Sequence, residues 1–459
     1  MRSAVEGRLR RIRAAIALAA GGLATTAPAA APQALLPDTL DITRAVQIAM
    51  RESPVLRSSQ TQADAAAADR LAAWGAFLPT AGGTASLSRS SFSRTTFVGE
   101  EGLSETLPQT LTSSQQGASQ RLGVNWTVLD GGRRFAALSQ SAANLRAAQR
   151  RYDDQQRSVI VTVRRQFLEA LRGQELLELT RAQIADRELE LDIARRRYAI
   201  AAVERTDVLG AESELLVAQT SLLAEQNLLQ TGLRQLVVSM GLPPEAGEGL
   251  VLTGEQGMPE GGSDIELIVR AAVTSDPELS ALEAERSAAS AALWAARMNY
   301  LPTITVGLGW ARNENFGPEE SFWQLGRLGD SSHGFSVTAS WNLFDGFDRE
   351  RQNAQASAAG RRAEEELRRR RIELEADVRR YAAEIQQLAQ TLDLLQRASA
   401  ISRERLEMQQ ERYRLGTASF IELQQATSSA QNTETSLIQR QYDYLIAWSN
   451  LAEYVEGRP

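Results

Sequence analysis

The hydrophobic and polar positions of this 459-residue chain follow one order that occurs twice. Each copy begins with a short amphipathic pattern and an Ala-rich helical pattern, which ends at Leu78-Pro79 in the first copy and at Leu301-Pro302 in the second. Two segments of alternating apolar and polar residues, separated by a polar segment, then predict a pair of β-strands. Two long helical patterns complete each copy, and their apolar residues recur every three and four positions, as in a coiled coil.

The spacing of matching residues shows that the two copies are a duplication. Pro79 and Pro302 are 223 positions apart (302 − 79 = 223), and Trp126 and Trp341 are 215 apart (341 − 126 = 215), so the copies differ mainly in the polar loop between their strands. A repeat of this kind has to be recognised before any single element is assigned. It predicts a first repeat at 31–240, a Gly/Pro/Glu-rich linker at 241–262 and a second repeat at 263–459, with β-hairpins at about 80–130 and 303–345, polar loops at 93–116 and 313–332, and long coiled-coil hairpins at about 133–240 and 347–455.

The predicted strands carry apolar residues on one face only. In the second strand, Leu122, Val124 and Trp126 alternate with Gly123 and Asn125. Four open strands per chain cannot lie in a bilayer alone, because their edges leave backbone groups unpaired. Strands of about ten residues suit an outer-membrane barrel, which needs at least eight strands. We therefore expect a mainly α-helical fold with a β-barrel portion, completed most simply by a homotrimer with twelve strands.

The first thirty residues have the three parts of a secretory signal peptide. Arginines are frequent in residues 1–13, the apolar segment 14–20 follows, and Ala27-Pro28-Ala29 is a small-residue cleavage site. No cysteine follows that would carry a lipid anchor, and no later segment approaches 18 uninterrupted apolar residues. We expect a signal peptide at 1–30 and an exported protein.

Composition excludes several classes of chemistry. The chain has no cysteine and one histidine, His333, so thiol catalysis, disulfides and Cys/His zinc sites are excluded. Its net charge is −7 and no arginine block stands apart from acidic neighbours, which argues against nucleic acid as a partner. The many carboxylates leave a hydrolase as one alternative, but no pair belongs to a recognisable pocket motif. We expect no enzyme activity, no cofactor and no metal site.

In order, spacing and duplication, these motifs resemble the TolC-like outer-membrane efflux and secretion channels, also called outer membrane factors. The resemblance covers the whole mature chain and implies a trimeric twelve-stranded β-barrel in the outer membrane, joined to an α-helical barrel that crosses the periplasm. It also implies an iris-like gate at the helical tips, a periplasmic adaptor (membrane fusion) protein and an inner-membrane RND, MFS or ABC transporter as partners. A structural periplasmic coiled-coil protein without channel activity is the alternative that the sequence leaves open.

The resemblance also suggests the gate residues. Tyr413 and Asp207 match a tyrosine–aspartate pair that joins the hairpin tips in the family, and Ala418 stands where the family has an arginine, so Arg205 is our candidate to replace it. Of two acidic pore positions, Glu422 keeps one and Gln425 replaces the other, so a trimer has three carboxylates there instead of six. The alternative is that Asp207 and Glu422 simply stabilise helix starts.

Two further groups complete the expected functional residues. The adaptor-docking positions lie in the turns between the long helices, where Ala201 replaces a common glycine and Gly416 is retained; the group is Ala201, Ala202, Leu415, Gly416 and Thr417. Trp126, Trp310 and Trp341 are candidates for a ring of aromatic residues at the lipid interface. For Trp126 and Trp341, packing where barrel meets helices is an equal alternative.

Overall fold

The computed structural model describes residues 39–98, 104–254, 265–316 and 330–456. The predicted signal peptide lies outside these residues. The described helices repeat in the order that the sequence predicts: α2 (Ile42–Glu52), α3 (Pro54–Gly75), α4 (Arg133–Ala199) and α5 (Arg205–Ser239) in the first copy, and α6 (Ile265–Ser275), α7 (Pro277–Met298), α8 (Asp348–Arg414) and α9 (Phe420–Glu456) in the second.

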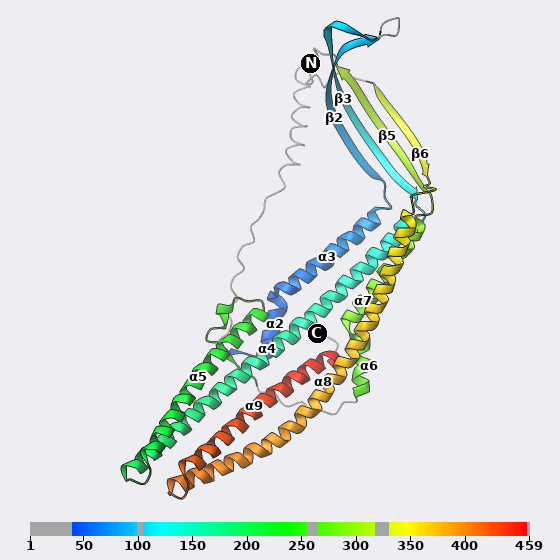
Figure 1. Ribbon diagram of the computed structural model, residues 1–459. Coiled ribbons are helices and arrows are strands. Elements are labelled where there is room, and N and C mark those ends of the chain that lie inside the picture. Colours follow the sequence, from blue (N-terminus) through cyan, green and yellow to red (C-terminus); the bar gives the residue numbers. More distant parts are fainter. Residues whose placement is uncertain (1–38, 99–103, 255–264, 317–329, 457–459) are drawn as a thin grey trace, which may run out of the picture.

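The long helices form two hairpins that lie side by side and end in neighbouring tips, as Figure 1 shows. Helices α4 and α8 have 67 residues each, which corresponds to about 100 Å at 1.5 Å per residue. Local signals explain where shorter helices start: the Asp276 carboxylate accepts the Leu279 N–H at 2.8 Å, and Pro277 fits the first turn of α7. Hairpin 1 (α4 and α5) contacts hairpin 2 (α8 and α9) mainly through α4 and α9.

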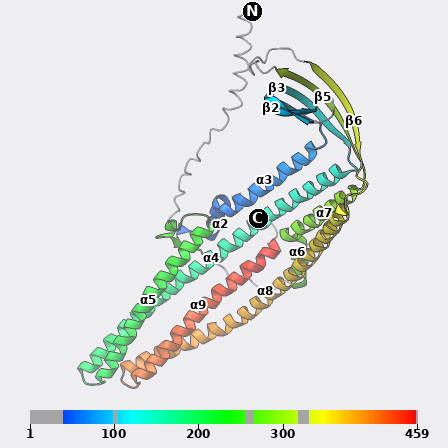
Figure 2. The same cartoon turned by 45° about the horizontal axis from the view of Figure 1, so that its top comes forward.

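A four-stranded antiparallel sheet lies at the opposite end from the tips. It consists of β2 (Thr80–Val98), β3 (Ser104–Leu129), β5 (Thr303–Phe316) and β6 (Ser331–Ser340), in the order β2-β3-β5-β6. The central pair, β3 and β5, joins the two copies, and Figure 2 shows the curvature of the sheet. The predicted pair of hairpins is confirmed, and together they make this four-stranded sheet.

The prediction of long polar loops is wrong for the first hairpin. Strands β2 and β3 run through most of 93–116 and pair as far as Val98 with Ser104, with one irregularity between Arg94 and Thr96. The ladder is made by backbone groups, so a Ser/Thr-rich segment can extend it without an apolar face. In the second hairpin, β5 continues to Phe316, and the rest of the expected loop up to residue 329 lies outside the described residues.

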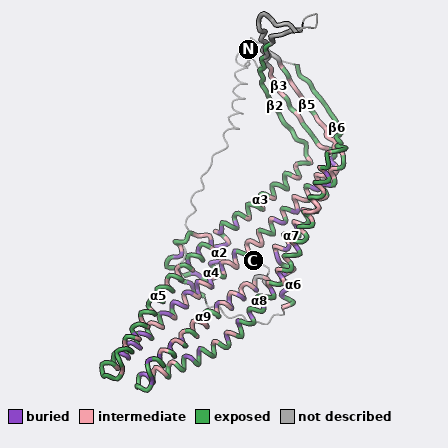
Figure 3. The backbone as a smooth tube through the Cα atoms, in the orientation of Figure 1, coloured by how far each residue is buried: buried purple, intermediate pink, exposed green. Residues whose placement is uncertain are grey.

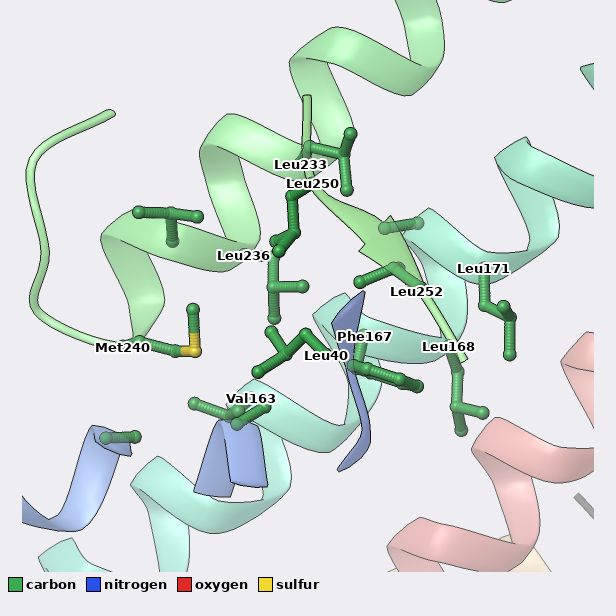
Figure 4. Packing of buried hydrophobic residues seen from close by; sticks show 14 of the residues in the cluster. Leu40, Val163, Phe167, Leu168, Leu171, Leu233, Leu236, Met240, Leu250 and Leu252 are labelled. Atoms are coloured by element: carbon green, nitrogen blue, oxygen red, sulfur yellow. The ribbon is translucent and has the colours of Figure 1, made fainter. Parts of the chain in front are cut away.

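The described part of the linker, residues 241–254, is packed against the helices. Its residues form a short 3₁₀ helix, η1 (Pro244–Gly247), and β4 (Val251–Leu252), which pairs in parallel with β1 (Thr39–Leu40). The Gln174 side chain of α4 accepts the Leu252 N–H at 3.1 Å and donates to the Leu252 carbonyl at 3.2 Å. Figure 4 shows Leu40 and Leu252 beside Phe167 in the core. Sequence patterns did not predict these two strands.

Buried residues form a line along the facing sides of the helices, and the outer sides are exposed (Figure 3). One apolar core lies where α2, α4, α5 and α9 meet, a second between α6, α8 and α9, and a third at the tips. Within the described residues, no helix is long and apolar enough to cross a membrane.

Candidate functional site

The two tip turns have the same backbone geometry. The Ala201 N–H donates to the Tyr198 carbonyl at 2.9 Å, and the Gly416 N–H donates to the Tyr413 carbonyl at 3.1 Å. Both turns need a left-handed residue, with φ at 57° for Ala201 and 83° for Gly416. Glycine accepts this conformation freely, whereas an alanine there loses roughly 1 kcal/mol. Ala201 therefore adopts the geometry of the glycine that it replaces.

The predicted docking residues all lie on the surface of the tips. Ala201, Ala202, Leu415, Gly416 and Thr417 are exposed. Two apolar side chains are conspicuous there, because Ile200 is 76% and Leu415 66% exposed. The tips therefore present a small apolar surface at the end of each hairpin.

Tyr413 is held by Arg197, a residue that the sequence did not single out. The Tyr413 side chain is buried, with 1% exposed. The Arg197 guanidinium donates from Nη1 to the Tyr413 carbonyl at 2.8 Å and lies 4.6 Å from the centre of the tyrosine ring. We call this contact the tip clasp (Arg197 and Tyr413), since it joins α4 of hairpin 1 to α8 of hairpin 2. The only sequence signal is that an arginine precedes the tyrosine in both copies, as Arg197-Tyr198 and Arg412-Tyr413.

Asp207 is near the clasp but is not its main partner. Burial raises the pKa of the Tyr413 hydroxyl, the Arg197 charge opposes this, and the Asp207 charge adds to it. The Tyr413 hydroxyl has no hydrogen-bond partner among the described residues. Arg205 is exposed at the start of α5 and, within the described chain, makes no ion pair. The arginine that contacts Tyr413 in the described chain is Arg197, and the gate role of Arg205 stays a prediction.

Glu422 stabilises the start of α9. Its carboxylate accepts the Ser419 N–H at 2.8 Å and the Ser419 hydroxyl at 3.2 Å, while the Glu422 N–H donates back to that hydroxyl. This is a capping box, and these hydrogen bonds lower the pKa of Glu422. Gln425 is exposed one turn further on, and Ala418 is buried in the apolar cluster at the tips, with 8% exposed.

Two of the predicted interface tryptophans act at the corner where strands meet helices. The Trp126 indole donates from Nε1 to the Phe77 carbonyl at 3.0 Å, and the Trp341 indole donates to the Tyr300 carbonyl at 3.1 Å. Both side chains remain about half exposed, at 45% and 62%. These hydrogen bonds agree with the packing alternative, and a role of the two exposed side chains at the lipid interface stays a prediction. Trp310 lies in β5 opposite Leu122 and His333.

An arginine strengthens each corner in the same way. Arg134 pairs with Asp130 at 3.2 Å, and Arg349 pairs with Asp345 at 2.9 Å. The Arg134 guanidinium lies 5.1 Å from the centre of the Phe77 ring, and the Arg349 guanidinium lies 4.8 Å from the centre of the Tyr300 ring. The contacts at the corner between sheet and long helices are therefore duplicated, as the sequence is. No group of three or more His, Asp or Glu side chains gathers as a metal site in the described chain.

Comparisons with known proteins agree with this architecture. The pattern of the outer membrane efflux protein family matches residues 45–242 and 268–456. Protein CyaE of Bordetella pertussis is 27% identical over 354 residues, covering 76% of this chain and 69% of CyaE.

Solved channels share the fold. The CmeC outer membrane channel of Campylobacter jejuni superimposes with a TM-score of 0.76 at 14% identity, over 91% of this chain and 85% of CmeC. The outer membrane protein VceC of Vibrio cholerae gives 0.73 at 16% identity, over 90% and 94%. The family match covers most of both repeats and describes a transport channel, which is not an enzyme. The chain therefore belongs to the TolC-like outer membrane efflux protein family.

Proposed function

We propose that three copies of this chain form an exit duct through the outer membrane and periplasm, as part of a tripartite efflux or type I secretion system. The observation that carries this proposal is that each protomer has two unpartnered edges, which run from the sheet to the tips. One edge consists of β2, α3 and α5, and the other of β6 and α8.

The sheet cannot be complete within one chain. Strands β2 and β6 are its outer strands, and each leaves one row of backbone groups without a partner in the sheet. Apolar side chains such as Val124, Phe335 and Val337 are exposed on one face, at 37%, 69% and 58%. Pairing of β6 with β2 of the next copy closes twelve strands around a threefold axis, with this face toward lipid.

The helical edges carry matching apolar rows. Each row has a large apolar residue every seven positions. The rows are Leu209, Leu216 and Leu223 on α5, and Leu394, Ile401 and Met408 on α8. All six side chains are between 54% and 67% exposed. Rows with this heptad spacing form coiled-coil seams. We therefore place α8 of one copy against α5 of the next, which closes a helical barrel.

The tips then form the periplasmic gate. The tip clasp holds the two hairpins of each copy together, and Asp207, Glu422 and Gln425 lie close to the passage. The exposed Ile200 and Leu415 are the surface on which an adaptor docks. An inner-membrane RND, MFS or ABC transporter supplies the energy, because the duct itself catalyses no reaction.

The experiment that tests this proposal is the mass of the protein purified in detergent from outer membranes, followed by conductance in planar bilayers. Three chains of roughly 47 kDa each, after loss of about 30 residues, are expected. Ile401→Asp places a charge in the α8 row and is expected to give monomers. Glu407→Ala, at an exposed position about a third of a turn away from that row on the same helix, is expected to leave the trimer unchanged. A soluble periplasmic monomer or dimer from the unaltered chain would contradict the duct and favour the structural coiled-coil protein.

A further inference from the structure

A buried charged group lies in hairpin 1 above the tip clasp. Arg187 and Glu190 of α4 are 4% and 3% exposed, and Arg187 Nη1 lies 3.0 Å from Glu190 Oε2. Arg187 Nη2 also lies 3.6 Å from Glu214 Oε2 of α5. Ten residues of α4 separate Arg187 from Arg197, a rise of about 15 Å.

Three hydrogen bonds connect this group to hairpin 2. All of them reach side chains of α9, and each joins a charged group to a neutral one. They run from Arg187 Nη2 to Gln431 Oε1 at 3.0 Å, from Thr427 Oγ1 to Glu190 Oε1 at 2.7 Å, and from Gln424 Nε2 to Glu214 Oε1 at 2.5 Å. Thr427 is almost fully buried, with 1% exposed.

The distribution of charge in this group is one-sided. The charged side chains all belong to hairpin 1, and their partners on α9 are an alcohol and two amides. When the hairpins separate, Arg187 therefore keeps Glu190 and Glu214 as counter-ions. A fully buried ion pair across the seam at this position would leave two unpaired charges when the hairpins separate, which is far more costly.

The neighbouring parts of the seam contain apolar clusters. The ion pair that crosses the seam, Arg172 with Asp443 at 3.2 Å, lies about 22 Å further toward the sheet, and both of its side chains are about a third exposed. Toward the tips, Leu191 and Leu423 belong to one buried cluster, and toward the sheet Leu171 and Tyr442 belong to another. Well-packed apolar residues in the middle of the seam would stabilise the contact between the hairpins at least as much, because a buried ion pair adds little net stability. Buried hydrogen bonds are directional, and they hold the helices in one register and break as a unit.

We propose that this cluster is a second, reversible fastening of the gate. We call it the latch (Arg187, Glu190, Glu214, Gln424, Thr427 and Gln431), and it rests on the proposed function. Arg187 is its positioning residue, since it holds both carboxylates toward α9. The latch keeps the hairpins in register after the tip clasp is released and lets them separate without stranding a charge.

Thr427 provides the most conservative test. Thr427→Val keeps the shape and removes the hydroxyl donor, while Thr427→Ser keeps the donor and is the matched control. In planar bilayers we expect Thr427→Val to raise the ratio of open to closed hairpins in each protomer about tenfold, as expected for one hydrogen bond to a charged group lost per protomer. Thr427→Ser behaves like the unaltered trimer. Arg187→Ala leaves two carboxylates uncompensated in the seam and has the larger effect.

A second readout follows separation of the hairpins directly. The chain has no cysteine, so Thr427→Cys introduces a single buried thiol. A membrane-impermeant maleimide is expected to label this thiol slowly. When Thr427→Cys is combined with Arg187→Ala, labelling is expected to be about tenfold faster, while the detergent-solubilised trimer keeps its mass.

The outcomes separate the latch from the duct. Equal conductance of Thr427→Val and Thr427→Ser, with no faster labelling when Arg187→Ala is added, would overturn the latch. If Arg197→Ala opens the channel under those conditions, the duct stands and the tip clasp alone closes it. If no variant and no unaltered protein forms a conducting trimer, the proposed function fails, and the latch with it.

Discussion

Removal of the Arg197 side chain is the sharpest perturbation of the tip clasp. Its hydrogen bond to the Tyr413 carbonyl has a charged donor and a length of 2.8 Å, a type that contributes about 1.5–3 kcal/mol. The position of the guanidinium over the ring adds about 0.5–2 kcal/mol. Because Arg197 is only partly buried, we take the lower end of both ranges, about 2 kcal/mol per protomer.

Single-channel recording in planar bilayers measures this change. A loss of about 2 kcal/mol per protomer shifts the equilibrium between closed and open tips roughly 30-fold, so Arg197→Ala is expected to spend much longer in high-conductance states. Arg197→Lys keeps the charge and loses the planar stacking, so its time in high-conductance states is expected to lie between those of the unaltered channel and of Arg197→Ala. Arg196→Ala is the matched control, because its side chain is 78% exposed and pairs only with Asp192 on the same helix, a contact of little energetic value.

Two results would refute this reasoning. A trimeric Arg197→Ala channel with unchanged conductance would show that the clasp does not close the tips. An equal rise for Arg196→Ala would show that conductance responds to the total charge at the tips, independently of the contact with Tyr413.

Three further predictions concern other parts of the chain. A Cβ atom at Gly210 would lie 2.8 Å from the Phe420 ring, so Gly210→Ala is expected to destabilise the tip by about 1–3 kcal/mol and lower the melting temperature; an unchanged value would mean that the ring moves aside freely. Ala201→Gly relieves the left-handed strain and is expected to stabilise its turn by about 1 kcal/mol, measured as slower proteolysis at the tip, and faster cleavage would contradict it. Burial and two neighbouring carboxylates raise the pKa of Asp154 to about 6, above its value in the unfolded chain, so the folded protein loses stability as the pH rises through about 4 to 6. Asp154→Asn is expected to flatten the melting temperature between pH 4 and pH 7, and an unaltered slope would exclude this carboxyl as its source.

The local features of this fold were readable in the sequence. The duplicated order, the ends of the helices and the helix-start alternative for Glu422 depend on apolar periodicity and on residues such as Pro79 and Gly416, whose effect acts within a few positions. Family membership followed from the same signals, because their order and spacing occur twice.

The lengths of the first two strands were less predictable. Ser/Thr-rich residues in 93–116 suggested a loop, yet the backbone ladder continues through them. Parallel pairing of β1 with β4 also escaped prediction, since two-residue strands from distant parts of the chain leave no pattern.

By itself, the sequence determined the duplicated helix–hairpin architecture and the location of the tips. Only the tertiary structure decided which side chains meet there, and it selected Arg197 for Tyr413 and Arg187 for Gln431. These partners are 216 and 244 positions apart. Their meeting depends on the relative rotation and register of two hairpins, which local periodicity does not encode. That register is set by packing along the whole seam between α4 and α9, and therefore by the fold as a unit.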